Sequence, residues 1–380
     1  MPFNTLSYIR QKYKHWQFTF IYCMIRKKDG TKMQHKLKKG LLSILILANL
    51  IALLSGCSLR KETSMKDYAF YFDTIISIEI YGSSNRDILD HCFDIAKECD
   101  GLFSSQNPES DISRINEHAG EYVTCDSKTV SLLEKAVYYG NMSQGIFDVT
   151  LGRLSDLWNN SEIAKNVNND SNIVDKEFIP KSEDIQALLP GIDYRKIDIK
   201  EQQVMLKDNT CKIDVGGIAK GYVADLIKEY LQTQNITSAC IDLGGNILTI
   251  GKKYDKDCFQ IGIQKPFGQQ NETIDILLVE DKSIVSSGIY ERYFKVDDRI
   301  YHHILDCQTG YPVQNDLYMV TIISSSSADG DALSTISFLL GKEKGMEYIE
   351  SLEDVEAIFV TKDYELLYSS GAKQYSRTQK

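Results

Sequence analysis

Thirteen consecutive residues show, one after another, the patterns of a strand, a turn and a helix: Ile213-Asp214-Val215-Gly216-Gly217-Ile218-Ala219-Lys220-Gly221-Tyr222-Val223-Ala224-Asp225. The pattern predicts a short strand at Ile213–Val215, a turn at Gly216-Gly217 and a helix over Ala219–Leu231. Free backbone N–H groups at such a helix start point towards an anion. A Gly-Gly turn before a helix is more often a plain connection, but Lys220 opposes the helix dipole unless a negative group lies nearby. The stretch is therefore a candidate phosphate site, although it has neither G-x-G-x-x-G nor the Gly-Lys-Ser/Thr of a P-loop.

The segments on both sides of this stretch predict an α+β fold. Upstream, we expect a β run at Tyr71–Tyr81, helices at Arg86–Phe103, from the cap Asp126 through Tyr139 and at Leu151–Trp158, and a helical turn from Ser182 to Pro190-Gly191. Downstream, we expect strands at Ser238–Leu243, Ile247–Ile250, Phe259–Gln264, Ile274–Val279 and Tyr318–Ser324, hairpin turns at Asp297-Asp298 and Lys362-Asp363, and a helix over Ala332–Leu340 that ends at Gly341. Because short turns join most neighbouring strands, the sheets should be largely antiparallel, with flanking helices. No linker divides residues 66–375, which we expect to form a single compact unit.

Residues 1–56 have the pattern of a targeting segment. Basic residues follow Met33 and precede an apolar run from Leu41 to Leu54, which is shorter than the roughly 20 residues that span a bilayer. The run leads into Leu54-Ser55-Gly56-Cys57, an ending that resembles a bacterial lipobox.

That resemblance implies a lipoprotein signal peptide in residues 1–56, with Met33 as the true start. Cys57 would carry the lipid and residues 57–65 would form a lipidated tether. The protein would then be anchored at the extracytoplasmic face of the cell membrane. The alternative is an ordinary signal peptide with a chance cysteine.

The charge of the chain excludes nucleic acid as a partner. Residues 1–56 contain ten basic and one acidic side chain, so the chain from Cys57 onwards has 33 basic and 52 acidic residues and a net formal charge of −19. Such a surface repels nucleic acid and anionic lipid headgroups, so a lipid rather than electrostatics must hold the protein at the membrane. A bound anion would need a local concentration of cations.

The cysteine spacing indicates neither a zinc site nor a disulfide framework. Seven cysteines follow Cys57, none of them in a CxxC pair, and an odd number cannot all be paired. Cys92 and Cys99 lie seven residues apart on a predicted helix, about 10.5 Å along its axis, which is too far for a disulfide. We expect most of these thiols to be buried as small apolar groups.

A second candidate site lies in the segment Ala328–Thr335. Asp331 and Thr335 are four residues apart, so both oxygens should lie on one face of a helix start. Hard oxygen ligands that leave room for water and phosphate are what Mg²⁺ prefers. The alternative is that Asp331 is an N-cap and Thr335 a half-buried helix residue.

Two further segments contain candidate residues. His302 and His303 are adjacent on a predicted strand and should face opposite sides, so at most one serves a given site, and a neutral His can take a proton from a hydroxyl near pH 7. A lone His is more often structural than catalytic. The segment Gly145–Thr150, considered alone, favours a turn entering a helix with Asp148 as its cap.

Together these segments resemble the ApbE family, the FAD:protein FMN transferases. The resemblance follows the chain in order through Phe72-Asp73-Thr74, Asn107-Pro108, Ser110–Asn116, Gly145–Thr150, Ile213–Asp225, Asp242–Asn246, Ser287–Arg292, His303–Asp306 and Asp331–Thr335. It implies an ApbE-like fold, with residues 66–375 as the catalytic domain. It also implies a Mg²⁺-dependent reaction in which FAD, as substrate, gives FMN to a Ser or Thr hydroxyl of a partner flavoprotein and AMP leaves.

The resemblance assigns a role to each matching position. The metal ligands would be Asp331, Thr335 and a main-chain oxygen near Gly217, and His303 would be the base. The residues that contact FAD would be Phe72, Ile146, Phe147, Asp148, Asp214, Lys220 and Ile304. The acceptor would be a membrane or extracytoplasmic electron-transfer protein.

The chain departs from the family pattern at two places. The family often has Met-Gly-Thr where this chain has Phe72-Asp73-Thr74, so a flavin contact by Met is replaced or lost. Asp329 adds a carboxylate beside the expected metal site and could alter its metal preference.

Three other functions stay open at this point. The same fold could act as a Mg²⁺-dependent FAD pyrophosphatase, with water in place of the protein hydroxyl. A non-catalytic flavin-binding lipoprotein would bind FAD without releasing AMP. A solute-binding lipoprotein would have two lobes and parallel crossovers, which the sequence does not predict.

Overall fold

A computed structural model describes residue 43 and residues 63–159, 175–253, 257–269 and 271–378. The expected signal peptide, the Met33 start, Cys57 and most of the tether lie outside these residues. The chain divides into two compact units, residues 1–61 and 62–380, and every described residue except Ser43 belongs to the second. Within the described part of the chain, no helix combines the length and the apolar composition needed to cross a membrane.

The centre of the fold is an eight-stranded sheet in which every neighbouring pair is antiparallel. In order across the sheet, the strands are β1 (Ser64–Tyr71), β2 (Thr74–Tyr81), β6 (Ala239–Leu243), β7 (Asn246–Ile250), β10 (Ser283–Gly288), β13 (Leu317–Ser324), β14 (Glu356–Thr361) and β15 (Leu366–Tyr368). Smaller antiparallel sheets are formed by β3 (Val123–Thr124), β5 (Gln203–Leu206) and β4 (Ile197–Lys200), by β8 (Phe259–Gln264) with β9 (Thr273–Val279), and by β11 (Tyr293–Val296) with β12 (Arg299–His302). The predicted α+β class with antiparallel sheets is confirmed.

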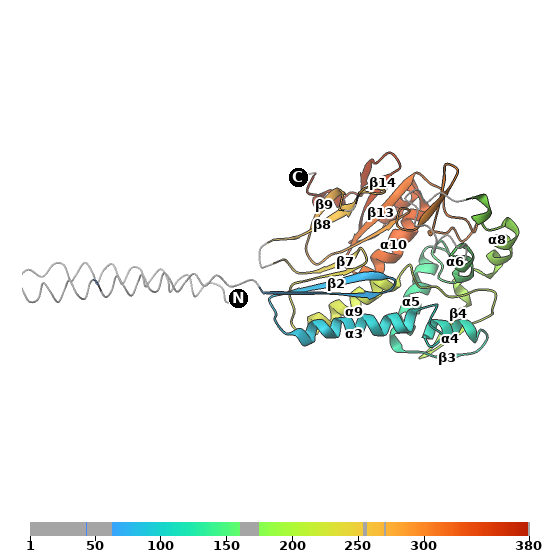
Figure 1. The fold of residues 1–380 in the computed structure, drawn as a ribbon, viewed down its shortest axis with the longest axis horizontal. Coiled ribbons are helices and arrows are strands. Elements are labelled where there is room, and N and C mark those ends of the chain that lie inside the picture. The colour runs from blue at the N-terminus through green and yellow to red at the C-terminus, as the bar shows by residue number, and fades with distance from the viewer. Residues whose placement is uncertain (1–42, 44–62, 160–174, 254–256, 270, 379–380) are drawn as a thin grey trace, which may run out of the picture. The chain divides into compact units, whose positions relative to one another are not determined.

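Helices cover one face of the large sheet, where α3 and α9 lie side by side along β2 (Figure 1). The helices are α3 (Arg86–Phe103), α4 (Asp111–Glu117), α5 (Ser127–Met142), α6 (Gly152–Asn159), α8 (Ser182–Leu188), α9 (Ala219–Thr233), α10 (Ser327–Leu340) and α11 (Lys342–Glu350). The main core lies between the sheet and α3, α4, α5, α9, α10 and α11, and it includes Ile76, Ile78 and Ile80, the alternating residues predicted to face inwards. The buried residues of α6 and α8 form a separate core with the β11–β12 hairpin. A second core lies between the sheet and the β8–β9 hairpin.

Two helices that are about a hundred residues apart in the sequence are in close contact. A Cβ atom at Gly221 of α9 would lie 2.2 Å from the carbonyl oxygen of Ser327, so only glycine allows this approach. Asp225, one turn later, accepts hydrogen bonds from the N–H groups of Ser327 (2.8 Å) and Ala328 (3.0 Å). These contacts bring the start of α10 against the first two turns of α9.

One predicted strand is two strands. Tyr71–Tyr81 was expected to be a continuous β run, but Phe72 (φ 55°) and Asp73 (φ 54°) both have positive φ and separate β1 from β2. Two central residues with positive φ are the signature of a type I′ hairpin turn. The prediction failed because the turn has no glycine or asparagine at either position.

The boundaries of the unit also differ from the prediction. β1 begins at Ser64, inside the stretch expected to be tether, and pairs with β2 along its whole length. At the other end, Ser376 is fully buried and the N–H of Arg377 donates to the carbonyl of Ile276. The compact unit therefore extends on both sides of residues 66–375.

The prediction of a strand at Ile213–Val215 is wrong, since these residues belong to no sheet. The Asn116 side chain takes the place of a neighbouring strand: its Oδ1 accepts from the N–H of Ile213 (2.7 Å) and its Nδ2 donates to the carbonyl of Ile213 (3.0 Å). The N–H of Asp214 donates to the carbonyl of Val149 (2.7 Å).

The late helix begins earlier than expected. The N-cap of α10 is Ser326, whose Oγ accepts from the N–H of Asp329, so Asp331 is not a cap and lies in the second turn. The sequence patterns also missed β10, which is rich in serine, and the short or highly charged helices α4 and α11.

Replacing Gly221 by alanine should destabilise the protein, because the new methyl group overlaps the backbone of α10. We expect the free energy of unfolding to fall by at least about 1–3 kcal/mol. The matched control is Gly101→Ala in α3, where nothing lies within 4 Å of the added Cβ. That control should stabilise the helix by roughly 0.5–1 kcal/mol. Urea unfolding of both variants measures the difference, and equal effects would contradict the close packing of α9 on α10.

Candidate active site

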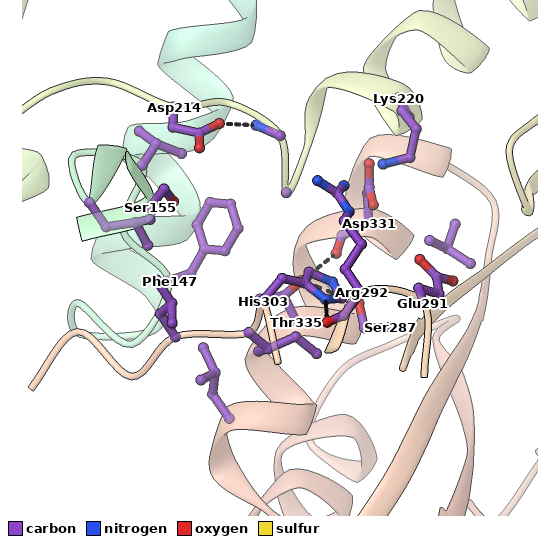
Figure 2. Close-up of a pocket in the computed structure, with 18 of the residues that line it drawn as sticks. Phe147, Ser155, Asp214, Lys220, Ser287, Glu291, Arg292, His303, Asp331 and Thr335 are labelled. Atoms are coloured by element: carbon purple, nitrogen blue, oxygen red, sulfur yellow. Dashed lines mark hydrogen bonds between the residues drawn. The ribbon is translucent and has the colours of Figure 1, made fainter. Parts of the chain in front are cut away.

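A cavity of about 220 Å³ lies where the glycine turn, α10 and several loops meet. Its walls come from segments that are far apart in the sequence. They include the loop before α6, the Gly216–Lys220 turn, Gly244–Asn246, Val285–Ser287 of β10, Glu291 and Arg292 in the loop before β11, His303–Leu305 and the inner face of α10. Figure 2 shows Lys220, Asp331 and Arg292 gathered between the glycine turn and α10.

The cavity brings together ten of the eleven residues that the sequence assigned to FAD, the metal or the base. They are Ile146, Phe147, Asp148, Asp214, Gly217, Lys220, His303, Ile304, Asp331 and Thr335. The eleventh, Phe72, does not line this cavity. It sits in the hairpin turn, where its N–H donates to Asp100 Oδ1 (2.8 Å) and its side chain packs against the main core.

The glycine turn and α10 are joined by a hydrogen bond. The N–H of Gly221 donates to Asp331 Oδ2 (3.0 Å), and the Asp331 side chain is buried at the cavity wall. Burial raises the pKa of this carboxyl, while the charge of Lys220 and the Gly221 N–H oppose the rise. Among the described residues, Asp331 has no ion-pair partner within 4 Å, so its charge is not fully compensated by the protein.

Two backbone donors of the glycine turn are available to a ligand. The N–H of Gly216 is taken by Asp214 Oδ1 (2.9 Å), and those of Ile218 and Ala219 by the carbonyl of Val215. In the described part of the chain, the N–H groups of Gly217 and Lys220 have no acceptor. An anion in the cavity could accept from both, as the sequence pattern predicted.

Thr335 is held in place by neighbouring hydroxyls. Its Oγ1 lies 3.3 Å from Ser287 Oγ and donates to the carbonyl oxygen of Asp331 (3.4 Å), and Ser287 also contacts Ser334 Oγ (2.8 Å). Ser287 belongs to a segment of the family resemblance but is not among the predicted site residues. Its contacts link β10 to the helix that carries Asp331.

These oxygens fit a divalent cation. A buried carboxylate without an ion pair, a nearby hydroxyl and open space beside them are what Mg²⁺ needs when substrate oxygens and water complete its shell. Within the described residues, no cluster of three or more His, Cys, Asp or Glu side chains could hold a metal by itself. The ion would therefore depend on ligands from the substrate.

The carboxylate of Asp148 is held by hydrogen bonds at the cavity wall. Its Oδ1 accepts from the N–H (2.8 Å) and Oγ1 (2.6 Å) of Thr150, and its Oδ2 accepts from the N–H of Tyr194 (2.8 Å). Burial raises its pKa, although these hydrogen bonds oppose the rise. The neighbouring Phe147 is buried, and its ring would lie 3.3 Å from a Cβ at Gly217. This segment therefore shapes the wall against which the glycine turn packs.

The two histidines have different environments, as their alternation predicted. His302 is buried, its Nε2 donates to the carbonyl of Val313 (2.9 Å), and its Nδ1 accepts from the N–H of Ile304 (3.3 Å). His303 lines the cavity, and its Nδ1 lies 3.3 Å from the carbonyl oxygen of Arg292. Since a carbonyl only accepts, Nδ1 carries the proton and Nε2 keeps a free lone pair.

The His303 ring keeps accessible area in the open cavity, yet protein atoms surround it on the other sides. This desolvation and the positive charges of Arg292 and Lys220 hold the pKa of His303 well below its ordinary value. The ring is therefore neutral at pH 7, which is the state a proton acceptor requires.

The prediction for Asp329 is wrong. Its carboxylate does not line the cavity and lies 3.8 Å from Lys135 Nζ of α5. Asp329 is two positions before Asp331 on a helix with 3.6 residues per turn, so the two side chains face different directions. Asp329 therefore adds no ligand to the candidate metal site.

Sequence reasoning missed several lining residues. The most informative are Ser287, Glu291, Arg292 and Asn246, all inside segments that entered only as family motifs. The signal available in the sequence was their position inside those motifs, because Ser287 and Asn246 each adjoin a glycine and Glu291 and Arg292 follow shortly after Gly288. Asn246 is buried at the cavity wall, and its side chain is one of the groups that oppose the rise in the pKa of Asp331, a proximity that no sequence pattern could indicate.

Known proteins include clear relatives of this chain. The sequence profile of the ApbE family matches residues 72–359. The chain belongs to the ApbE family. It is 34% identical over 305 residues to the FAD:protein FMN transferase of Klebsiella pneumoniae (strain 342), a match that covers 78% of this chain and 88% of that protein. It is 31% identical over 299 residues to the FAD:protein FMN transferase of Treponema pallidum (strain Nichols), covering 74% and 79%.

Solved structures support the same fold. The ApbE protein of Thermotoga maritima superposes with a TM-score of 0.73 at 30% identity, covering 83% of this chain and all of that one. The flavin transferase ApbE of Vibrio cholerae gives a TM-score of 0.71 at 23% identity, covering 83% and 99%, and shows the fold alone. The expected ApbE-like fold is therefore confirmed.

Replacing Asp331 by asparagine should weaken divalent-metal binding, because the variant keeps the volume and an acceptor for Gly221 but loses the charge. We expect the affinity for Mn²⁺, used as a probe with FAD present, to fall by more than about tenfold, since hydrogen bonds and contacts to charged groups contribute roughly 1.5–3 kcal/mol. Asp331→Ala should behave similarly, and extra Mg²⁺ should partly restore its lost activity.

The matched control is Asp329→Asn, which removes a carboxylate from the same helix outside the cavity. Electron paramagnetic resonance of bound Mn²⁺ measures both variants. Equal affinity in Asp331→Asn and the unmodified protein would rule out Asp331 as a metal ligand.

Proposed function

We propose that this protein is a Mg²⁺-dependent FAD:protein FMN transferase that attaches FMN to a Thr or Ser hydroxyl of a partner flavoprotein and releases AMP. The observation that carries the proposal is the Gly221–Asp331 hydrogen bond, which joins the glycine turn to α10 at the wall of one cavity. His303 lines the same cavity. The curated relatives described above bear the name of this activity.

The chain's own residues can bind the diphosphate of FAD. Lys220 supplies a positive charge, and the N–H groups of Gly217 and Lys220 are available as donors. Asp331, Thr335 and the main-chain oxygen of Gly217 would hold Mg²⁺, which supplies charge neutralisation of the diphosphate when bound. Ile146, Phe147 and Ile304 offer an apolar wall to an aromatic ring of the dinucleotide.

We assign to His303 the role of accepting the proton of the acceptor hydroxyl. A hydroxyl has a pKa far above 7, so its attack on phosphorus needs a positioned base. The Arg292 carbonyl fixes the proton of His303 on Nδ1 and leaves Nε2 free. The proton therefore moves from the acceptor oxygen to Nε2 as that oxygen approaches phosphorus.

The reaction balances with these groups. A bond forms between the acceptor oxygen and the phosphorus of the FMN half, and the bond from that phosphorus to the bridging oxygen breaks. AMP leaves with the bridging oxygen and its charge, and the hydroxyl proton is on His303. Positioning and charge stabilisation account for most catalysis in such transfers.

The same proposal includes the location of the protein. A lipid on Cys57 would hold the catalytic unit at the extracytoplasmic face of the membrane, and the acceptor would be an electron-transfer flavoprotein of the membrane or that compartment. The support is the sequence around Cys57 and the start of β1 at Ser64, only a few residues later.

A mass measurement separates transfer from its alternatives. The protein is incubated with FAD, Mg²⁺ and a candidate acceptor flavoprotein, and we expect an acceptor heavier by one FMN together with free AMP. Free FMN and AMP without an adduct would support an FAD pyrophosphatase instead. Bound FAD with no AMP at any Mg²⁺ concentration would support a non-catalytic flavin-binding lipoprotein.

Replacing His303 by alanine should leave FAD binding intact and abolish most FMN transfer, by roughly 10²–10⁴-fold, the usual contribution of a general base. The control is His302→Gln, which alters a buried histidine outside the cavity. Since the pKa of His303 is lowered, its neutral form persists below pH 6.5, so the acid limb of kcat/KM should lie below that pH. If His303→Ala transferred FMN at the rate of the unmodified protein, His303 could not be the base.

A further inference from the structure

The Arg292 guanidinium has no hydrogen-bond or ion-pair partner in the described protein. Arg292 lies in the loop between β10 and β11, its side chain is exposed to the cavity, and it forms neither an ion pair nor a side-chain hydrogen bond with another described residue. Its charge is one of those that oppose the rise in the pKa of the adjacent Glu291 carboxyl, but no ion pair joins the two side chains. A free guanidinium at the wall of a cavity suited to an anion therefore requires an explanation.

The loop that carries Arg292 is held firmly from the other side. Ile289 is buried and its N–H donates to the carbonyl of Tyr318 (3.1 Å), and the ring of Tyr290 packs edge-on against Phe267. These contacts fix the backbone immediately before Glu291 and Arg292. The arginine is thus directed into the cavity by a rigid segment.

Arg292 is also next to the candidate base. Its carbonyl oxygen accepts from both the backbone N–H and the Nδ1 of His303, each at 3.3 Å. Its positive charge is one of the groups that lower the pKa of His303, so the guanidinium lies near the imidazole. Both side chains line the same cavity, so one ligand can contact His303 and Arg292 together.

We propose that the Arg292 guanidinium binds the non-bridging oxygens of the phosphoryl group that is attacked, which is the phosphate of the FMN half. This inference rests on the proposed function. His303 must contact the acceptor hydroxyl, and that hydroxyl must contact the attacked phosphorus. In an in-line displacement the leaving group departs on the opposite side, so a cation beside the base faces the attacked phosphate rather than the AMP phosphate.

The chemistry of the side chain fits this role. A guanidinium presents two parallel N–H groups that match two oxygens of one phosphate, and it stays charged at any physiological pH. Neutralising those oxygens reduces their repulsion of the incoming acceptor oxygen as the new O–P bond forms. The bond to the bridging oxygen still breaks towards AMP, so Arg292 would remain with FMN after the transfer.

The test compares four ligands on the full-length protein with Mg²⁺: FAD, FMN, AMP and riboflavin. In Arg292→Gln, we expect the affinities for FAD and FMN to fall by roughly 10–100-fold, as for a lost charge-assisted contact. The affinities for AMP and riboflavin should stay within about twofold. Arg292→Lys, which keeps the charge but loses the two parallel N–H groups, should give an intermediate loss of affinity for FAD and FMN.

The matched control is Arg153→Gln, since Arg153 is an exposed arginine of α6 that does not line the cavity. Isothermal titration calorimetry measures each affinity, and unchanged riboflavin binding shows that the variant is folded. A loss for AMP but not FMN, or no loss for any ligand, would overturn the proposal. If Arg292→Gln fails to fold, the FMN-against-AMP comparison in Arg292→Lys decides. These affinities are measured without any reaction taking place. They therefore test the role of Arg292 even if the protein proves not to transfer FMN.

Discussion

The contact between α9 and α10 is the constraint on which the rest of this structure depends. Glycine at position 221 allows the backbone of α9 to approach Ser327, and the freed N–H then reaches the Asp331 carboxylate. Asp225 satisfies the first N–H groups of α10 from the same helix. Gly221 and Asp225, which lie four positions apart in α9, thus determine where the glycine turn and α10 meet at the cavity.

The acidic character of the chain makes the positive side chains in the cavity important. The chain from Cys57 onwards carries a net formal charge of −19, which repels a diphosphate at long range. Lys220 and Arg292 concentrate positive charge in the cavity, and the buried Asp331 makes a divalent cation favourable there. In the proposed function, these few residues would bind the diphosphate locally, against the long-range repulsion of the acidic surface.

The sequence patterns predicted those elements whose periodicity is strong. The helix Arg86–Phe103 was found with its true bounds because its apolar stripe keeps the helical period along the whole segment. Ile213–Val215 was mistaken for a strand because the residue that pairs with it, Asn116, lies 97 positions earlier, and a side chain in place of a strand leaves no periodic signal. The hairpin turn at Phe72-Asp73 was missed because positive φ there is imposed by strand pairing, not by residue type. Site residues could be predicted where a sequence motif and its chemistry coincide, as for Lys220. Arg292 and Ser287 could not be assigned without the fold, because their contacts depend on which groups face them across the cavity.

All seven cysteines in the described residues are free thiols, and Cys92, Cys99, Cys125 and Cys211 are buried. Burial raises the pKa of the thiols of Cys92, Cys99 and Cys125 to about 12, which leaves almost no thiolate for exchange chemistry. The sheet and its helices therefore hold together without a covalent crosslink. Maturation of this catalytic unit does not call for an oxidising folding pathway, and the same fold should form in a reducing environment.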